Sequence, residues 1–173
     1  MALLAEELVE EWLNRKGFFT IRGIKLGVDE IDLVGIKKEL HQFRCVHVEV
    51  CVSMNPVSYI SNVPKKTQKE TGKSANSAKR SSDEIEQGVN EFVEKKFLKP
   101  RKISLLKELF PSSWDKLFVV HKVKDEKELD LIAAKNIEII RLETVLEELS
   151  DKNPVPAAAG NDLFNLVSIK KNL

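Results

Sequence analysis

The strongest constraint on the fold is a strict two-residue alternation along residues 44–52 (RCVHVEVCV). Successive side chains of an extended strand point to opposite faces. One face of this run is entirely valine, at Val46, Val48, Val50 and Val52. The other face carries the groups able to bind metal or move protons, namely Cys45, His47, Glu49 and Cys51. The run therefore predicts a strand with one core face and one chemically active face, although His47 taken alone is more typical of a hydrogen-bonded packing residue.

A second β-branched run, residues 27–36 (GVDEIDLVGI), sets Asp32 among apolar residues, much as Glu49 is set in the first run. An ionised carboxylate in an apolar strand is unfavourable unless it is paired or coordinated. The short polar connection at residues 37–42 predicts an antiparallel hairpin that brings the two runs together. A divalent cation shared by Asp32 and Glu49 would account for both, and replacing either by alanine should then leave metal-free stability steady or higher. The alternative is that both carboxylates point outward from half-buried strands.

Length and composition indicate one folded domain. The chain has 173 residues, of which 42% are hydrophobic and 32% charged, as in globular proteins. It has no apolar run long enough to span a bilayer and no basic region followed by a hydrophobic stretch at its N-terminus, which predicts a cytoplasmic protein without a membrane partner. Cys45 and Cys51 would lie about 20 Å apart on one strand, too far for a disulfide or a metal site built from them alone.

Positive charge gathers in residues 61–81, which we expect to form a mobile loop. This basic loop has no apolar periodicity and is rich in Ser, Thr, Asn and Gly. Its cations could neutralise nucleic-acid phosphates, and the alternative is a solvated loop without a partner. The residues expected to bind nucleic acid are Lys65, Lys66, Lys69, Lys73, Lys79 and Arg80.

The order of elements predicts an α/β fold. An apolar stripe through Ala5, Val9 and Leu13 predicts a first helix that ends at Gly17. We then expect strands at 18–26, 28–36 and 43–52, a helix at 82–97 with Ser82 as its N-cap, a short helix at 105–110, a strand at 117–123, a helix at 126–135, a strand at 137–142 and a helix at 143–150. The order α-β-β-β-α-β-α-β-α indicates a mixed β-sheet flanked by helices on both faces. Residues 1–150 would form this domain, and residues 151–173 a linker and a short C-terminal tail element.

This order and these acidic residues resemble the PD-(D/E)xK phosphodiesterases, a restriction-endonuclease-like family that includes Holliday-junction resolvases and Mrr-type restriction enzymes. The resemblance covers residues 3–142. In that family an Asp of the second strand and a Glu-x-Lys of the third bind Mg²⁺ and activate water. Asp32 matches the Asp, Glu49 matches the Glu, and the Val50 carbonyl falls at the family's backbone-ligand position. The resemblance implies an endonuclease dependent on Mg²⁺ or Mn²⁺, with DNA the expected substrate, and leaves RNA and a homodimer open.

The chain departs from the family at the lysine, where it has Cys51. A thiol cannot serve as a cation at neutral pH, so another element would have to supply one. The candidates lie in the basic loop or at the end of the following helix, at Lys65, Lys66, Lys95 and Lys96. The alternative function is a non-catalytic nucleic-acid-binding or assembly module on the same fold. A lysine near Asp32 and Glu49 would favour the enzyme.

Two weaker matches complete the expected site. Gln87 resembles a glutamine that some nuclease branches carry on the helix after the third strand, although Glu91 stands where their aromatic residue falls. Glu6 is the expected helix carboxylate of resolvase-like members, with Glu10 second, and surface solvation is the alternative for each. A third function, an acid–base enzyme unrelated to nucleic acids, is disfavoured by the basic loop and by the lack of a phosphate-cradling glycine motif.

Overall fold

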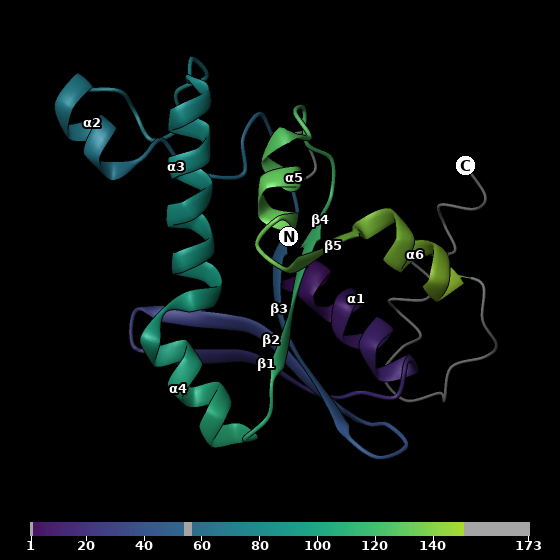
Figure 1. Ribbon diagram of the computed structural model, residues 1–173. Coiled ribbons are helices and arrows are strands. Elements are labelled where there is room, and N and C mark those ends of the chain that lie inside the picture. The colour runs from purple at the N-terminus through teal and green to yellow at the C-terminus, as the bar shows by residue number, and fades with distance from the viewer. Residues whose placement is uncertain (1, 54–56, 151–173) are drawn as a thin grey trace.

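The computed structural model describes residues 2–53 and 57–150, which build a mixed sheet with helices on both faces (Figure 1). The five strands lie in chain order across the sheet. They are β1 (Phe19–Leu26), β2 (Asp29–Lys38), β3 (Phe43–Cys51), β4 (Trp114–Val120) and β5 (Ile137–Arg141). The first three are antiparallel, and β3, β4 and β5 are parallel. The predicted α/β class with a mixed sheet is confirmed, while the expected linker and tail element lie outside the described residues.

The hairpin predicted from the two carboxylate-bearing runs is confirmed by β2 and β3. Leu33 pairs with Val48, and Gly35 pairs with Val46. Asp32 is the residue next to Leu33 and Glu49 the residue next to Val48, so the two carboxylates lie at the same end of the hairpin. Gly35 is needed for close packing here, because a Cβ at this position would lie only 3.0 Å from Val46 Cγ2. The register therefore fixes the relative positions of the two acidic residues.

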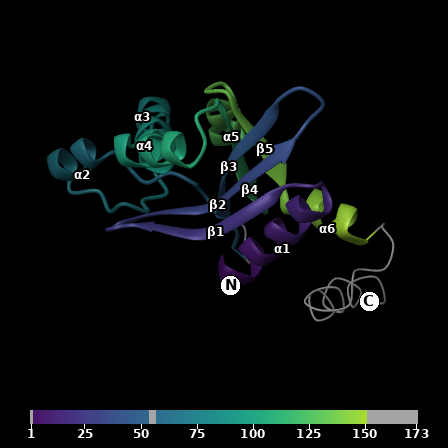
Figure 2. The same ribbon diagram turned by 90° about the horizontal axis from the view of Figure 1, so that it is seen from below.

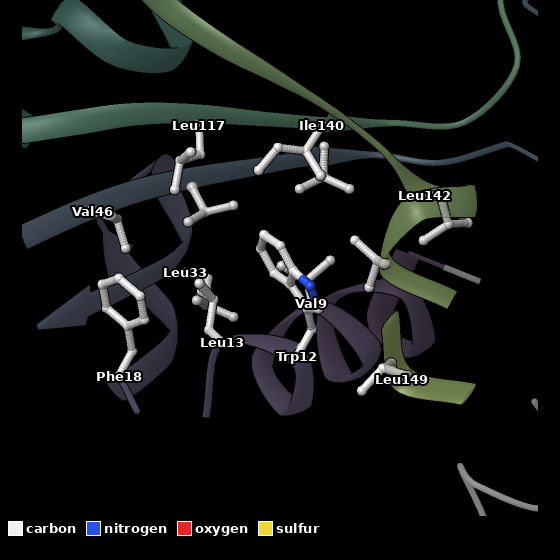
Figure 3. Close-up of a cluster of buried hydrophobic side chains, with 13 residues drawn as sticks. Val9, Trp12, Leu13, Phe18, Leu33, Val46, Leu117, Ile140, Leu142 and Leu149 are labelled. Carbon is white, nitrogen blue, oxygen red and sulfur yellow. The ribbon is translucent and has the colours of Figure 1, made fainter. Parts of the chain in front are cut away.

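One face of the sheet packs against helices α1 (Ala2–Arg15) and α6 (Leu142–Ser150) through apolar side chains (Figure 3). Val9, Trp12 and Leu13 of α1 are buried there, which confirms the predicted helical stripe. Helix α1 is followed by Gly17, whose φ of 85° suits glycine and turns the chain into β1. Within the described segments, no helix combines the length and apolarity needed to cross a membrane.

The opposite face carries a nearly continuous column of helix beside α5 (Lys127–Ala133), as Figure 1 shows. The column consists of α3 (Ser82–Val93), the π-helix η1 (Glu94–Leu98) and α4 (Pro100–Leu109). Beneath α3 and α5 lies one apolar cluster around Phe97 and Phe118, and beneath α4 a second around Leu106. A group of buried polar side chains lies on this same face of the sheet.

The structure corrects several predicted boundaries. The expected loop at 61–81 contains helix α2 (Lys65–Thr71), which has no buried residue and therefore leaves no apolar pattern in the sequence. The N-cap of α3 is Ser81, not Ser82, because Ser81 and Glu84 exchange reciprocal hydrogen bonds as a capping box. Helix α4 begins at Pro100 rather than at residue 105, since proline is well suited to a first helical position. Strand β4 likewise begins and ends three residues earlier than expected, at Trp114 and Val120.

Candidate functional site

The candidate site lies on the odd-numbered face of β3, at the end nearest α3 and α4. Glu49 is completely buried, and Asp32 of β2 is 9% exposed. The backbone N–H of Val50 donates a hydrogen bond of 2.8 Å to Asp32 Oδ2, which ties the β2 carboxylate to β3. The predicted alternation along β3 is confirmed, since Val46 and Val48 belong to the α1 face while Glu49 lies among groups of α4 and η1.

Glu49 is surrounded by three basic side chains. Lys102 Nζ lies 2.6 Å from Glu49 Oε1, and Lys96 Nζ lies 2.6 Å from Oε2. His47 Nε2 lies 3.0 Å from Oε1. Lys96 Nζ also lies 3.5 Å from Asp32 Oδ2, so one ammonium group spans the carboxylates of both strands. The structure thus brings together Asp32 and Glu49, and it places a cation beside them.

The two carboxyl groups have opposite electrostatic settings. Burial, followed by the nearby charge of Glu49, raises the pKa of Asp32 to about 6. Burial also acts to raise the pKa of Glu49, but the His47 hydrogen bond and the two lysine charges outweigh it and lower that pKa to about 2. Glu49 is therefore a fixed negative charge at neutral pH. Asp32 titrates close to neutrality and would gain from a further nearby cation.

Lys96 reaches the site from the π-helix that joins α3 to α4. A π-helical turn is wider than an α-helical turn and is frequent at functional sites. Within η1, Phe97 is buried against the sheet and Lys96 points its ammonium group at the carboxylates. Lys102 Nζ donates a hydrogen bond of 2.8 Å to the Lys96 carbonyl, which anchors the backbone of this turn. Lys96 was among the predicted sources of the missing cation.

Sequence reasoning missed Lys102, which is only 2% exposed. A lysine in an amphipathic helix is ordinarily assigned to the solvent face. The one available signal is its spacing, four residues before Leu106, which places both side chains on the same buried stripe of α4. A lysine on an apolar stripe implies a buried counterion, and Glu49 is that counterion.

His47 orients Glu49 and is itself fixed by packing. Its ring lies 5.0 Å from that of Phe97, measured between centroids, and burial lowers its pKa. The neutral ring must carry its proton on Nε2 to donate to Glu49. The buried Nδ1 then has no hydrogen-bond partner among the described residues, which is an unfavourable arrangement for packing alone.

The remaining predicted site residues differ in how close they lie to Asp32 and Glu49. Glu6 is half-buried, and its pKa is raised by burial and by Glu30, with smaller influences from Lys96 and Glu49, so it borders the site. Glu10 instead pairs with Arg22 at 3.1 Å. Gln87 is exposed on α3, well before Lys96 along the helical column.

Cys51 follows Glu49 on the odd face of β3 and is partly buried against the cluster beneath α3 and α5. Burial raises the pKa of its thiol, with opposing influences from Lys96 and Asp32. It is therefore a neutral group at pH 7. The cation at the site comes from the helical column instead.

The basic loop divides into exposed and internally paired cations. Lys73 pairs with Glu84 at 2.6 Å. Arg80 donates to the carbonyls of Ser61, Ala75 and Ser77, and so holds the loop itself. The exposed members of the predicted nucleic-acid-binding set are Lys65, Lys66, Lys69 and Lys79.

The donor atoms around Asp32 suit a hard cation but do not form a complete cage. Across residues 2–53 and 57–150, no three His, Cys, Asp or Glu side chains converge as a ready-made metal-binding group. Asp32 and Glu49 supply carboxylate oxygens, and Val50 is held against Asp32 by its backbone. Mg²⁺ is usually held by only one or two protein carboxylates together with water and substrate phosphate. Asp32, whose carboxylate form is disfavoured by its surroundings, fits such an ion.

Comparisons with known proteins bear on the fold. No protein-family model matches the chain, and no curated protein matches it. A solved structure described as the crystal structure of a protein of unknown function, AF1548, is similar to it, with a TM-score of 0.51 and 14% sequence identity. The match covers 98% of this chain and 78% of that chain. At this identity the likeness shows a shared fold alone.

Proposed function

We propose that this chain is a metal-dependent endonuclease of restriction-endonuclease-like fold that hydrolyses phosphodiester bonds in DNA. The observation that carries the proposal is Lys96, which lies within ion-pair distance of both Asp32 and Glu49. It supplies from η1 the cation that is lacking at Cys51. A lysine in this place favours a hydrolytic site over a degenerate one that only binds.

The residues of the site would have different roles, which follow from their surroundings. Asp32, Glu49 and the Val50 carbonyl would hold Mg²⁺ or Mn²⁺. The bound ion would supply a water of lowered pKa and neutralise charge on the scissile phosphate. Lys96 would stabilise the negative charge that develops on the phosphate oxygens during attack. His47 and Lys102 would keep Glu49 ionised and correctly oriented.

Exposed basic side chains support nucleic acid as the substrate. Helix α2 and the α3–η1–α4 column lie on the side of the molecule toward which the tip of the β1–β2 hairpin extends (Figure 2). Each lysine that contacts a phosphate releases counterions and adds to the salt dependence of binding. The exposed cations on these elements include Lys65, Lys66, Lys69, Lys95 and Arg101.

The direct test is nicking of supercoiled DNA and cleavage of branched DNA in Mg²⁺. Asp32→Asn keeps the size of the side chain and an acceptor for the Val50 N–H but removes the negative charge that would hold the metal ion, so activity should fall by roughly 100-fold or more. Asp29→Asn is the matched control, because Asp29 lies on the same strand but pairs with Lys99. A wild type that binds DNA without cutting it would leave the non-catalytic binding or assembly module.

A second variant tests the role assigned to Lys96. Cys51→Lys restores the lysine at the family's own position, on the same face of β3 as Glu49. Because Lys96 already occupies the site, the added ammonium would crowd a like charge, and cleavage should decrease. An increase in cleavage would show that Lys96 does not act as the catalytic cation.

A further inference from the structure

The two lysines at Glu49 differ in how firmly they are held. Lys102 is almost fully enclosed, and its ammonium group contacts both Glu49 Oε1 and the Lys96 carbonyl. The Lys96 side chain is 30% exposed, and it forms ion pairs with Glu49 Oε2 and Asp32 Oδ2. Lys102 is therefore a permanent counterion, whereas Lys96 has a path to solvent.

The two carboxylate oxygens of Glu49 differ in the same way, one having enclosed partners and the other the partly exposed Lys96. Oε1 faces the interior partners, at 3.0 Å from His47 Nε2 and 2.6 Å from Lys102 Nζ. Oε2 faces Lys96, which also approaches the Asp32 carboxylate. Lys96 thus contacts one oxygen of each of the two carboxylates that would hold a divalent cation.

We propose that Lys96 is a displaceable counterion that competes with a divalent cation for Glu49 Oε2 and Asp32 Oδ2. This inference rests on the metal site of the proposed function and assigns Lys96 a second role at that site. When Lys96 holds the carboxylates, the site is closed and charge-balanced without metal. With a divalent cation held between the carboxylates, the Lys96 ammonium group would turn outward toward solvent.

The backbone of η1 makes such a swing local. The Lys96 carbonyl is held by Lys102, and the neighbouring Phe97 is buried against His47. Both anchors persist when the Lys96 side chain changes rotamer, because neither involves its ammonium group. The movement therefore requires side-chain rotation and no rearrangement of α3 or α4.

The competition can be measured without nucleic acid, by titrating Mn²⁺ into the metal-free protein at pH 8, where Asp32 is ionised. Lys96→Met should bind Mn²⁺ about tenfold more tightly than the wild type, because no ammonium group has to be displaced. Lys95→Met is the matched control on the same π-helix, exposed to solvent, and should change the affinity by less than about threefold. Equal or weaker binding by Lys96→Met, or an equal gain in Lys95→Met, overturns the proposal.

Two further measurements guard against a misfolded variant. Lys96→Gln, a polar replacement of similar length, should show the same direction of change. In the wild type, amine acylation followed by peptide mapping should show several-fold more labelling of Lys96 when Mg²⁺ is added, with Lys95 and Lys102 unchanged. Labelling of Lys96 that is insensitive to saturating Mg²⁺ rejects displacement.

The outcomes separate this inference from the proposed nuclease activity. Tighter Mn²⁺ binding in Lys96→Met together with an inactive wild type would keep the displaceable lysine and reject the nuclease. Mg²⁺-dependent cleavage with unchanged Mn²⁺ affinity in Lys96→Met would do the reverse. Absence of Mn²⁺ binding in every variant rejects both.

Discussion

Val46 and Val48 on one face of β3 are buried beneath α1, and His47 and Glu49 on the other face are equally buried beneath η1 and α4. The first face is an apolar layer that stabilises the fold by excluding water. The second encloses carboxylates and two ammonium groups, an arrangement that rarely adds more stability than apolar residues of similar volume. Equal burial with opposite chemistry means that stability alone does not explain the charges of the second face.

The sharpest test of this difference is to remove Glu49. Glu49→Ala leaves Lys102 buried without its counterion, and we expect the free energy of unfolding to fall by about 3–5 kcal/mol at pH 7. The double variant Glu49→Ala/Lys102→Met removes the stranded charge as well and should recover a large part of that loss. Urea denaturation of both variants measures the two values, and a double variant no more stable than Glu49→Ala would contradict the assignment of Lys102.

Val48→Ala is the matched change on the apolar face, one residue away and equally buried. It removes two methyl groups and should cost about 2 kcal/mol by lost burial and an imperfectly filled cavity. This cost should be the same at low and high salt, because no charge is involved. Urea denaturation at two salt concentrations checks both statements, and a strong salt dependence would break the contrast between the faces.

The contribution of Asp32 to stability should change with pH in the opposite sense to that of Glu49. Its pKa is raised from 3.8 to about 6, so its contribution to stability is fully present below pH 4 and is lost as pH rises through 6. Asp32→Asn cannot ionise and should match the wild type near pH 4 but exceed it by about 3 kcal/mol at pH 7, since each unit of pKa shift corresponds to about 1.4 kcal/mol. Thermal unfolding across this pH range measures the gap, and a gap that does not grow between pH 4 and 7 would mean that Asp32 is an ordinary ion-pair partner.

The smallest expected effect concerns how tightly the apolar face is packed. Gly35→Ala would put a Cβ 3.0 Å from Val46 Cγ2 and 3.2 Å from a ring carbon of Phe18. Both neighbours are in a filled core, so we expect a loss of about 1 kcal/mol by overpacking. A stabilised Gly35→Ala in urea denaturation would show that this face has spare room.

Much of this site follows from strand periodicity. The alternation around Glu49 predicted both faces of β3, and the short connection to β2 predicted that Asp32 would lie beside it. The sequence alone predicts that removing either carboxylate leaves metal-free stability steady or higher. The ion pairs that Glu49 makes with Lys96 and Lys102 favour a loss of stability for Glu49 instead. The lysine contacts could not be derived, because they depend on how a helix some fifty residues later docks on the sheet.

Other features leave too little trace in a single sequence. Helix α2 buries no residue, so the sequence has no apolar periodicity that would predict it. The choice between Ser81 and Ser82 as N-cap depends on a side-chain contact with Glu84. The π-helix at Glu94–Leu98 has no characteristic amino-acid composition, and helix propensity predicts an α-helix for these residues.

The π-helix also makes the site sensitive to helical phase. A single-residue deletion within η1 would change which side chains of this turn face the sheet, because neighbouring residues of a helix point about 100° apart. The arrangement that brings Lys96 to Glu49, and the Lys96 carbonyl to Lys102, would then be lost even though both lysines were still encoded. A deletion between Gly72 and Lys79, in the segment that connects α2 to α3, would shift no such phase. Insertions and deletions should therefore be tolerated in that connection and excluded from a five-residue stretch of helix.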